Sequence, residues 1–140
     1  MTLVEVLFAI WVLVLSGLGL LASYQANLHL SEVSQQTGMA LNDLKDMMER
    51  IKATSFTNLQ ANFPSGAPNG VVGGGAEKYS PIIGGYTLSN EQITVQHQDP
   101  VTHQASVIAD PRELVVQLSW TNRGRTYQRS VMTIRASRAS

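Results

Sequence analysis

Charged side chains are absent from one long stretch of this 140-residue chain. No Asp, Glu, Lys or Arg occurs from Val6 to Ser31, and the residues up to Ala22 are apolar almost throughout, with Glu5 as their single charge. As a helix with a rise of about 1.5 Å per residue, residues 6–22 would span roughly 25 Å, close to the hydrocarbon thickness of a bilayer. This stretch constrains the fold most, because a helix that is apolar on every side needs an apolar environment all around it.

Several environments could surround such a helix. A globular core is excluded by size, since only about 85 residues would be left to cover the helix. A cleavable secretory signal is disfavoured, because no basic segment precedes the apolar block and no A-x-A site follows it. We therefore expect residues 1–24 to insert into a membrane or to pack among other apolar helices.

Residues 25–53 are predicted to continue the helix in amphipathic form, because apolar side chains recur there at spacings of three and four residues. The apolar set is Met39, Leu41, Leu44, Met48 and Ile51, and Asp43, Lys45, Asp46, Glu49, Arg50 and Lys52 are placed on the other faces. A helix from Thr2 to Ala53 would be roughly 78 Å long. A compact chain of this size has a radius of gyration of only about 14 Å. We expect the apolar half of the helix to project from a head formed by residues 25–140.

Glu5 is the exception within the apolar block. The spacing Thr2-x-x-Glu5 matches a capping box, in which the two side chains satisfy free amides at the start of a helix. A carboxylate in apolar surroundings nevertheless costs several kcal/mol unless it is paired with a cation. The first Lys or Arg of the chain is Lys45, so the only close positive group is an α-amine, either its own or that of a neighbouring chain.

The opening residues, Met1-Thr-Leu-Val-Glu-Val-Leu-Phe-Ala-Ile, resemble the mature N-terminus of the type IV filament superfamily, which comprises type IV pilins and the pseudopilins of type II secretion. The resemblance is tight over about 30 residues and covers the rest of the chain only in layout. It implies that a prepilin peptidase removes a short leader, that Met1 is N-methylated, and that Glu5 pairs with the N-terminal amine of an adjacent subunit during assembly.

The chain departs from the family pattern at several positions. Met1 stands where most pilins have Phe, as in certain minor pilins and pseudopilins, and Ala22 stands where Pro is frequent. Gly17 and Gly19 each cost about 1 kcal/mol of helix stability relative to Ala. They are candidates either for local helix melting in the filament or for close helix packing. The chain also lacks the paired cysteines that close a C-terminal loop in many pilins.

The head begins with a segment, residues 54–85, that is rich in Gly and Pro and is predicted to be a helix-to-sheet loop without regular structure. An antiparallel sheet is expected over residues 86–135, followed by a short tail, 136–140. Its predicted strands are Tyr86–Leu88, Gln92–Gln96, Ser106–Ile108, Leu114–Trp120 and Arg125–Arg135, with turns at Asp99-Pro100 and at residues 121–124.

The strongest of these strands has an apolar face formed by Leu114, Val116, Leu118 and Trp120, which alternate with more polar positions. A sheet of three to five strands laid over the second half of the helix would bury Leu41, Leu44, Met48 and Ile51. The predicted class is therefore α+β, with a long N-terminal helix packed against a small antiparallel sheet.

Charge is divided unevenly along the chain. Residues 1–111 carry four Lys or Arg against nine Asp or Glu, whereas residues 112–140 carry six Arg and one Glu. The candidates for a basic surface are Arg123, Arg125, Arg129, Arg135 and Arg138. They could bind DNA phosphates, but no aromatic platform accompanies them. We favour protection of an exposed edge strand, together with charge matching to the acidic side of a neighbouring subunit.

Nothing in the sequence indicates a catalytic or cofactor site. Cysteine is absent, and His29, His97 and His103 show no metal-binding spacing, so neither a metal nor a cofactor is expected. We expect a structural subunit of a pilus-like helical filament and not an enzyme. Such a subunit would reside in the inner membrane before assembly and depend on an assembly machinery. The alternatives are a minor pseudopilin of a secretion endopilus and a membrane-tethered periplasmic binding module.

Overall fold

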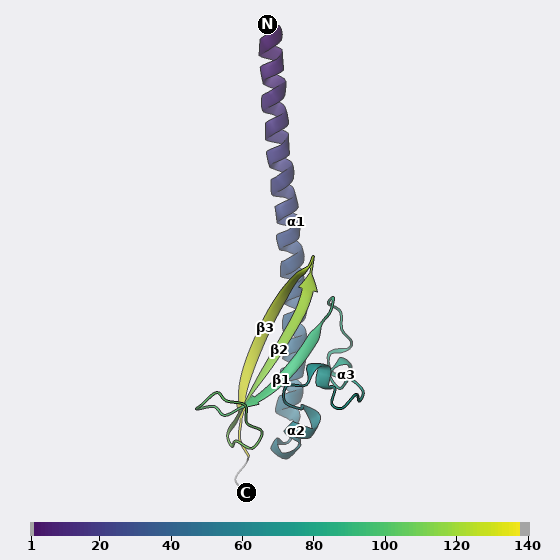
Figure 1. The fold of residues 1–140 in the computed structure, drawn as a ribbon, viewed down its shortest axis with the longest axis vertical. Helices are drawn as coiled ribbons and strands as arrows, with labels where there is room; N and C mark the ends of the chain where they lie inside the picture. The colour runs from purple at the N-terminus through teal and green to yellow at the C-terminus, as the bar shows by residue number, and fades with distance from the viewer. Residues whose placement is uncertain (1, 138–140) are drawn as a thin grey trace. The chain divides into compact units, whose positions relative to one another are not determined.

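The computed structural model describes residues 2–137 and has a long helix followed by short helical segments and a three-stranded sheet (Figure 1). The elements are α1 (Leu3–Ala53), η1 (Phe56–Asn58), α2 (Leu59–Asn62), η2 (Pro68–Gly70), α3 (Ser80–Ile83), β1 (Gln92–Gln98), β2 (Arg112–Asn122) and β3 (Arg125–Arg135). The predicted α+β class and the predicted end of the long helix are confirmed. The described residues group into two compact units, one ending at Gln36 and the other beginning at Thr37.

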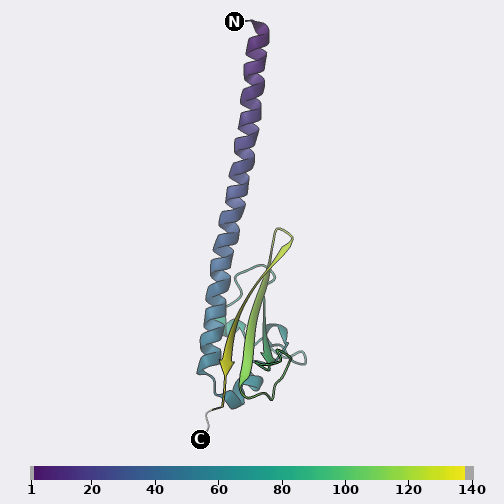
Figure 2. The same ribbon diagram turned by 90° about the vertical axis from the view of Figure 1, so that its left-hand side faces the viewer.

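The sheet of the second unit is an antiparallel meander in the order β1-β2-β3. In Figure 2, β3 is the strand nearest the viewer, and the C-terminal part of α1 lies beside the sheet. The predicted apolar face of β2 is confirmed, since Leu114, Val116, Leu118 and Trp120 are all buried. This alternation directs one face of β2 into the core and the other face outward.

The core of the head joins α1 to the inner face of the sheet. Its fully buried large side chains include Leu44, Met47, Ile51, Leu59, Phe63, Tyr79, Ile93, Leu114, Leu118 and Trp120. Leu44, Met48 and Ile51 are buried as predicted, but Leu41 is 48% exposed and its predicted burial is wrong. At 100° per residue, Leu41 lies roughly 80° from the centre of the buried stripe, and a sheet of only three strands does not reach it.

The β2–β3 hairpin has a tighter turn than the predicted four residues. β2 continues to Asn122, which pairs with Arg125, so only Arg123 and Gly124 form the turn. Both have positive φ, 49° and 77°. Two successive positive φ angles characterise the type I′ turn, whose twist matches that of the flanking strands.

The segment between α1 and the sheet is more regular than predicted. It contains η1, α2, η2 and α3, so the expectation of no regular structure is wrong. Pro68 and Pro81 each stand in the first turn of a short helix, where their missing N–H groups leave no helical hydrogen bond unmade. Gly84 ends α3 in the left-handed conformation at φ 76°.

Two of the predicted strands do not form, although the turn between them does. Tyr86–Leu88 is irregular because the Glu91 carboxylate accepts the N–H groups of Thr87 and Leu88, both at 3.0 Å. Ser106–Ile108 lies in a loop, and only its neighbour Ala105 forms an isolated bridge. The predicted turn at Asp99-Pro100 is confirmed.

The end of the sheet is joined to the end of α1 by Arg135. Its guanidinium donates to the carbonyl oxygen of Lys52 at 2.7 Å and to that of Thr54 at 3.0 Å. The last carbonyl groups of a helix have no partner within the helix and carry partial negative charge. Arg135 therefore caps α1 from a strand that lies far away in the sequence.

Two acidic side chains, Asp43 on α1 and Glu91 before β1, are buried close together. Asp43 Oδ2 and Glu91 Oε1 have no hydrogen-bond partner. Two buried carboxylates repel each other when both are charged, which favours a proton on one of them. Burial, followed by the charges of Glu91 and Asp46, raises the pKa of Asp43 to about 6. The prediction that Asp43 lies on a polar face of the helix is wrong.

Replacing Arg135 by Met should remove both hydrogen bonds to α1 while keeping a side chain of similar length. We expect a loss of about 2 kcal/mol in the free energy of unfolding, because these bonds have a charged donor. The measurement is urea unfolding of the full chain in detergent micelles, followed by near-ultraviolet circular dichroism. Arg129→Met on the same strand is the control, and equal stabilities for the two variants would contradict the capping role.

Replacing Asp43 by Asn should make the head less sensitive to rising pH. The raised pKa of Asp43 means that the folded state retains a proton that the unfolded state releases, so this side chain destabilises the fold as pH rises from about 4 to about 6. The stability of Asp43→Asn relative to wild type should therefore increase over this range, by up to about 3 kcal/mol.

The informative quantity is the difference in the free energy of unfolding between variant and wild type. The absolute values are less informative, because His97 changes stability with pH in the opposite direction to Asp43. Burial lowers the pKa of His97, so its contribution to stability is lost as pH falls below 6.5. This contribution is common to both proteins and cancels in the difference. Asn42→Gln, an exposed change on the same helix that removes no titratable group, should give a difference that does not vary with pH. A constant difference for Asp43→Asn as well would rule out the raised pKa of Asp43.

Candidate membrane and assembly segment

The start of α1 contains one half of the predicted capping box. Glu5 Oε2 accepts the backbone N–H of Thr2 at 3.3 Å, and the Thr2 carbonyl oxygen accepts the N–H groups of Glu5 and Val6 at 3.0 and 3.3 Å. Glu5 is exposed, so its carboxylate is accessible to a cation. Met1, the predicted site of N-methylation, lies outside the described residues.

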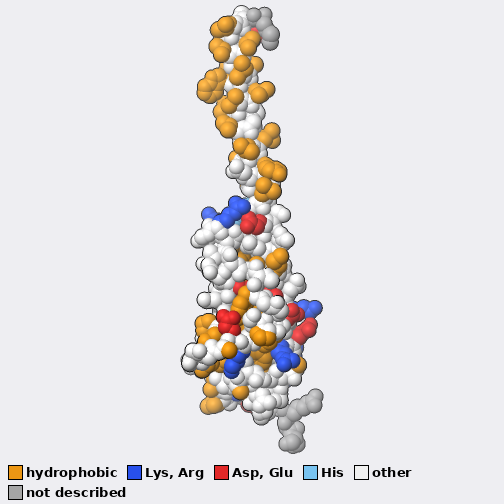
Figure 3. Space-filling model, turned by 90° about the vertical axis from the view of Figure 1, so that its right-hand side faces the viewer, with side chains coloured by type: hydrophobic (Ala, Val, Ile, Leu, Met, Phe, Trp, Pro, Cys, Tyr) orange, Lys and Arg blue, Asp and Glu red, His pale blue; other side chains and the backbone are white. Residues whose placement is uncertain are grey.

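The surface of α1 from Val6 to Ala22 is apolar on all sides. Successive residues of a helix point in directions 100° apart, so Leu13, Val14 and Leu15 face three different sides, and all three are exposed. No residue from Thr2 to Gln36 is buried. Figure 3 shows hydrophobic side chains along this part of the chain. By length and composition, α1 could cross a membrane, and its most apolar window has no buried residue.

Two hydroxyl groups in and directly after this apolar segment form hydrogen bonds within the helix. The Ser16 hydroxyl donates to the carbonyl oxygen of Val12 at 2.7 Å, and the Ser23 hydroxyl donates to that of Gly19 at 3.0 Å. Bonding to the carbonyl four residues earlier is the usual way in which a helix accommodates a hydroxyl without water. The signal for both bonds is local, because each Ser stands four residues after a carbonyl group of the same helix.

Gly17 and Gly19 lie in uninterrupted helix. A Cβ atom built at either position has no heavy atom within 4 Å outside the helix itself. The backbone at both positions is therefore open to close approach by another helix. Helix melting and close packing remain alternative predictions for these two residues.

The arginines predicted to form a basic surface are separated by the fold. Arg123 in the turn and Arg125 and Arg129 on β3 are exposed, whereas Arg135 is engaged with the end of α1. Arg138 lies outside the described residues. The nearest aromatic side chain on β3, Tyr127, stacks on Trp120 with ring centroids 5.6 Å apart. That ring face is thus already occupied, which weakens the case for stacking on nucleic-acid bases.

His97 lies in a buried polar cluster that sequence reasoning missed. Its Nε2 lies 2.7 Å from the carbonyl oxygen of Phe63, and its Nδ1 lies 3.2 Å from Nη1 of Arg112. Since Arg112 can only donate, Nδ1 accepts and Nε2 carries the proton. The Arg112 guanidinium also lies 4.9 Å from the centre of the Phe56 ring. Both imidazole nitrogens are used, so the cluster connects segments of the head and is not available to hold a metal.

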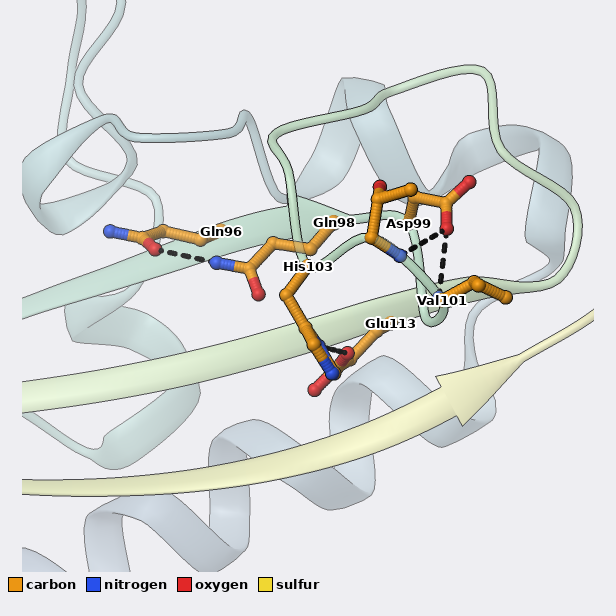
Figure 4. Close-up of polar contacts among 7 residues, drawn as sticks. Gln96, Gln98, Asp99, Val101, His103 and Glu113 are labelled. Carbon is orange, nitrogen blue, oxygen red and sulfur yellow. Dashed lines mark hydrogen bonds and ion pairs between the residues drawn. The ribbon is translucent and has the colours of Figure 1, made fainter.

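A second histidine, His103, holds a loop against the outer face of the sheet (Figure 4). Its Nδ1 lies 3.0 Å from Oε2 of Glu113, a side chain that is buried. The same loop is tied by Asp99 Oδ1, which accepts the N–H groups of Val101 and Thr102 at 2.8 and 3.0 Å. Within residues 2–137 no three metal-ligating side chains come together.

The apolar surface of α1 from Val6 to Ala22 is exposed throughout, and it follows directly after the exposed Glu5 carboxylate. Comparisons of the chain with protein-family models, with curated proteins and with solved structures give no match.

Proposed function

We propose that this protein is a structural subunit of a type IV pilus-like helical filament, assembled through the N-terminal part of α1. The observation that carries the proposal is the surface of α1 from Val6 to Ala22, which is apolar on every side and has no buried residue. Such a surface is stable only in lipid or among other apolar helices. A filament subunit would use both environments, first the inner membrane and then a core of like helices.

The transfer between these environments is favourable if little apolar surface meets water on the way. Lipid tails and the side chains of neighbouring helices are similarly apolar, so packing and polar contacts decide the association. Ser16 and Ser23 make no demand on water, because their hydroxyl groups bond within α1. The small residues Gly17 and Gly19 would let two helices approach closely.

Glu5 supplies a polar contact that can select the depth of an incoming subunit. Its Oε2 is bound to the N–H of Thr2, and its exposed carboxylate would pair with the α-amine of a neighbouring subunit. An ion pair surrounded by apolar helices is strongly position-dependent, because a carboxylate left unpaired there costs several kcal/mol. This contact would fix the axial register of the subunits.

Glu5→Gln and Glu5→Ala should both abolish filament formation while the monomer stays in the membrane fraction. Glutamine can take the place of glutamate in a capping box, so Glu5→Gln separates loss of charge from loss of the cap. The measurement is the amount of protein in sheared extracellular filaments relative to the membrane fraction, with Glu49→Gln as the control. Normal filament yield from Glu5→Gln would refute the pairing role.

Mass spectrometry of the protein purified from its native cells provides an independent test. We expect a polypeptide that begins at Met1 and carries one methyl group on its α-amine. Fractionation of the same cells separates the alternatives: a surface filament is recovered by shearing, a secretion endopilus stays periplasmic, and a tethered binding module stays with the membrane in monomeric form. An unmodified amine together with an exclusively monomeric membrane protein would contradict the proposal.

A further inference from the structure

The two outer edges of the sheet differ in how their backbone groups are satisfied. The edge of β1 is covered by the segment that follows α2. Asn69 Oδ1 accepts the N–H of Ile93 at 2.8 Å, Gly66 donates its N–H to the carbonyl oxygen of Val95 at 2.8 Å, and the Ser65 hydroxyl accepts the N–H of His97 at 3.1 Å. A further strand cannot pair with β1 without displacing this segment.

The edge of β3 is open by comparison. Within the described part of the chain, β2 is the only segment that forms backbone hydrogen bonds with this 11-residue strand. One row of its N–H and C=O groups therefore faces away from the sheet, and such a row is a template for another strand. In Figure 2 this edge is turned toward the viewer.

Apolar side chains lie on both faces beside the open edge. On the inner side a groove of about 340 Å³ lies between α1 and β3, and its lining combines the apolar Leu41, Met48 and Val131 with the charged Lys45, Glu49 and Lys52. On the outer side Met132 and Ile134 are 70% and 61% exposed. A strand added to β3 would have apolar neighbours on its two faces, so its best occupant has two successive apolar residues.

The chain itself contains a segment of this kind. Ser106–Ile108 has the composition of a strand but lies in a loop. Ser106 donates its N–H to the carbonyl oxygen of His97 at 2.9 Å, so the residues open to a further partner are Val107, which is 42% exposed, and Ile108, which is 90% exposed. Successive side chains of a strand point to opposite faces. Beside β3, one of these two residues would enter the groove, and the other would cover the outer face near Met132.

The distribution of charge favours contact between an acidic surface of one copy and a basic surface of another. From residue 79 to residue 111 the chain has no Lys or Arg, and after Glu113 it has no Asp or Glu. Hydrogen bonds from the backbone of Thr102 and from Ser137 lower the pKa values of Asp99 and Asp110 respectively, so both carboxylates are ionised at neutral pH. Pairing of β3 with β3 would instead bring arginines of the same sign together.

We infer that, in the filament, the segment Ser106–Ile108 of one copy adds as a short strand to the open edge of β3 of the next copy. This inference rests on the proposed function and names the contact between heads. The contact is heterologous, since each copy offers a different surface to each neighbour, and a heterologous contact that does not close generates a helical polymer. The Asp99 and Asp110 carboxylates would lie toward the Arg125 and Arg129 side of the neighbour.

Disulfide trapping tests the contact directly, because the chain contains no cysteine. Ile108→Cys is combined in turn with Ser130→Cys, Met132→Cys or Ile134→Cys, which samples three registers along the outward side of β3. Oxidised filaments should give a ladder of linked subunits on a non-reducing gel for at least one pair, since a disulfide requires Cα atoms within about 7 Å. Each single variant, and Ile108→Cys with Gln92→Cys on the covered edge, should give no ladder.

A second measurement covers the case in which the cysteine variants assemble poorly. Ile108→Thr and Arg129→Glu should each lower filament yield several-fold while membrane levels stay unchanged, and Val72→Thr on another exposed loop should have no effect. Filaments that form without a ladder for any pair, or normal yields from both single variants, would overturn the inference and leave the proposed function standing. Failure of the unaltered protein to form filaments would instead overturn the proposed function, and the inference with it.

Discussion

The exclusion of charge between Val6 and Ser31 governs how the rest of the molecule is organised. A helix satisfies its own backbone hydrogen bonds, so an apolar helix can leave water without leaving any N–H or C=O group unpaired. The two hydroxyl groups of Ser16 and Ser23 follow the same rule by bonding to carbonyl groups of the preceding turn. Glu5 is the one ionisable carboxylate at the start of this segment, and it requires a partner from outside the apolar block.

The same helix meets a different requirement after Thr37. There a narrow apolar stripe is sufficient, because the sheet covers only one side of α1, and polar side chains can occupy the others. The head is tied to this half of the helix at its C-terminal end, where Arg135 binds the last carbonyl groups. It is also tied at Asp43, which meets a second carboxyl group. The Arg135 contact stabilises the folded state at all ordinary pH values. The stability of the Asp43 contact depends on whether one carboxyl group carries a proton.

Local sequence signals predicted the elements that depend on local interactions. The alternation around Leu118 was sufficient to place β2 and its buried face, and the long helix followed from the period of its apolar residues. The failures involve partners distant in the sequence. Tyr86–Leu88 has the composition of a strand, but Glu91 takes its N–H groups. Asp43 has the spacing of a surface residue, but the turn that carries Glu91 folds over it.

The edge of β1 is covered and the edge of β3 is open because the connections next to these two strands differ in length. The connection between α1 and β1 passes beside β1 and covers its edge, whereas the tight Arg123-Gly124 turn leaves no residues to cover β3. An exposed edge is ordinarily protected by charge, and β3 carries Arg125 and Arg129. Charge of one sign repels a second β3 but attracts an acidic segment. The same arginines that prevent indiscriminate pairing can therefore select a particular partner strand, so edge protection and specific assembly are compatible roles.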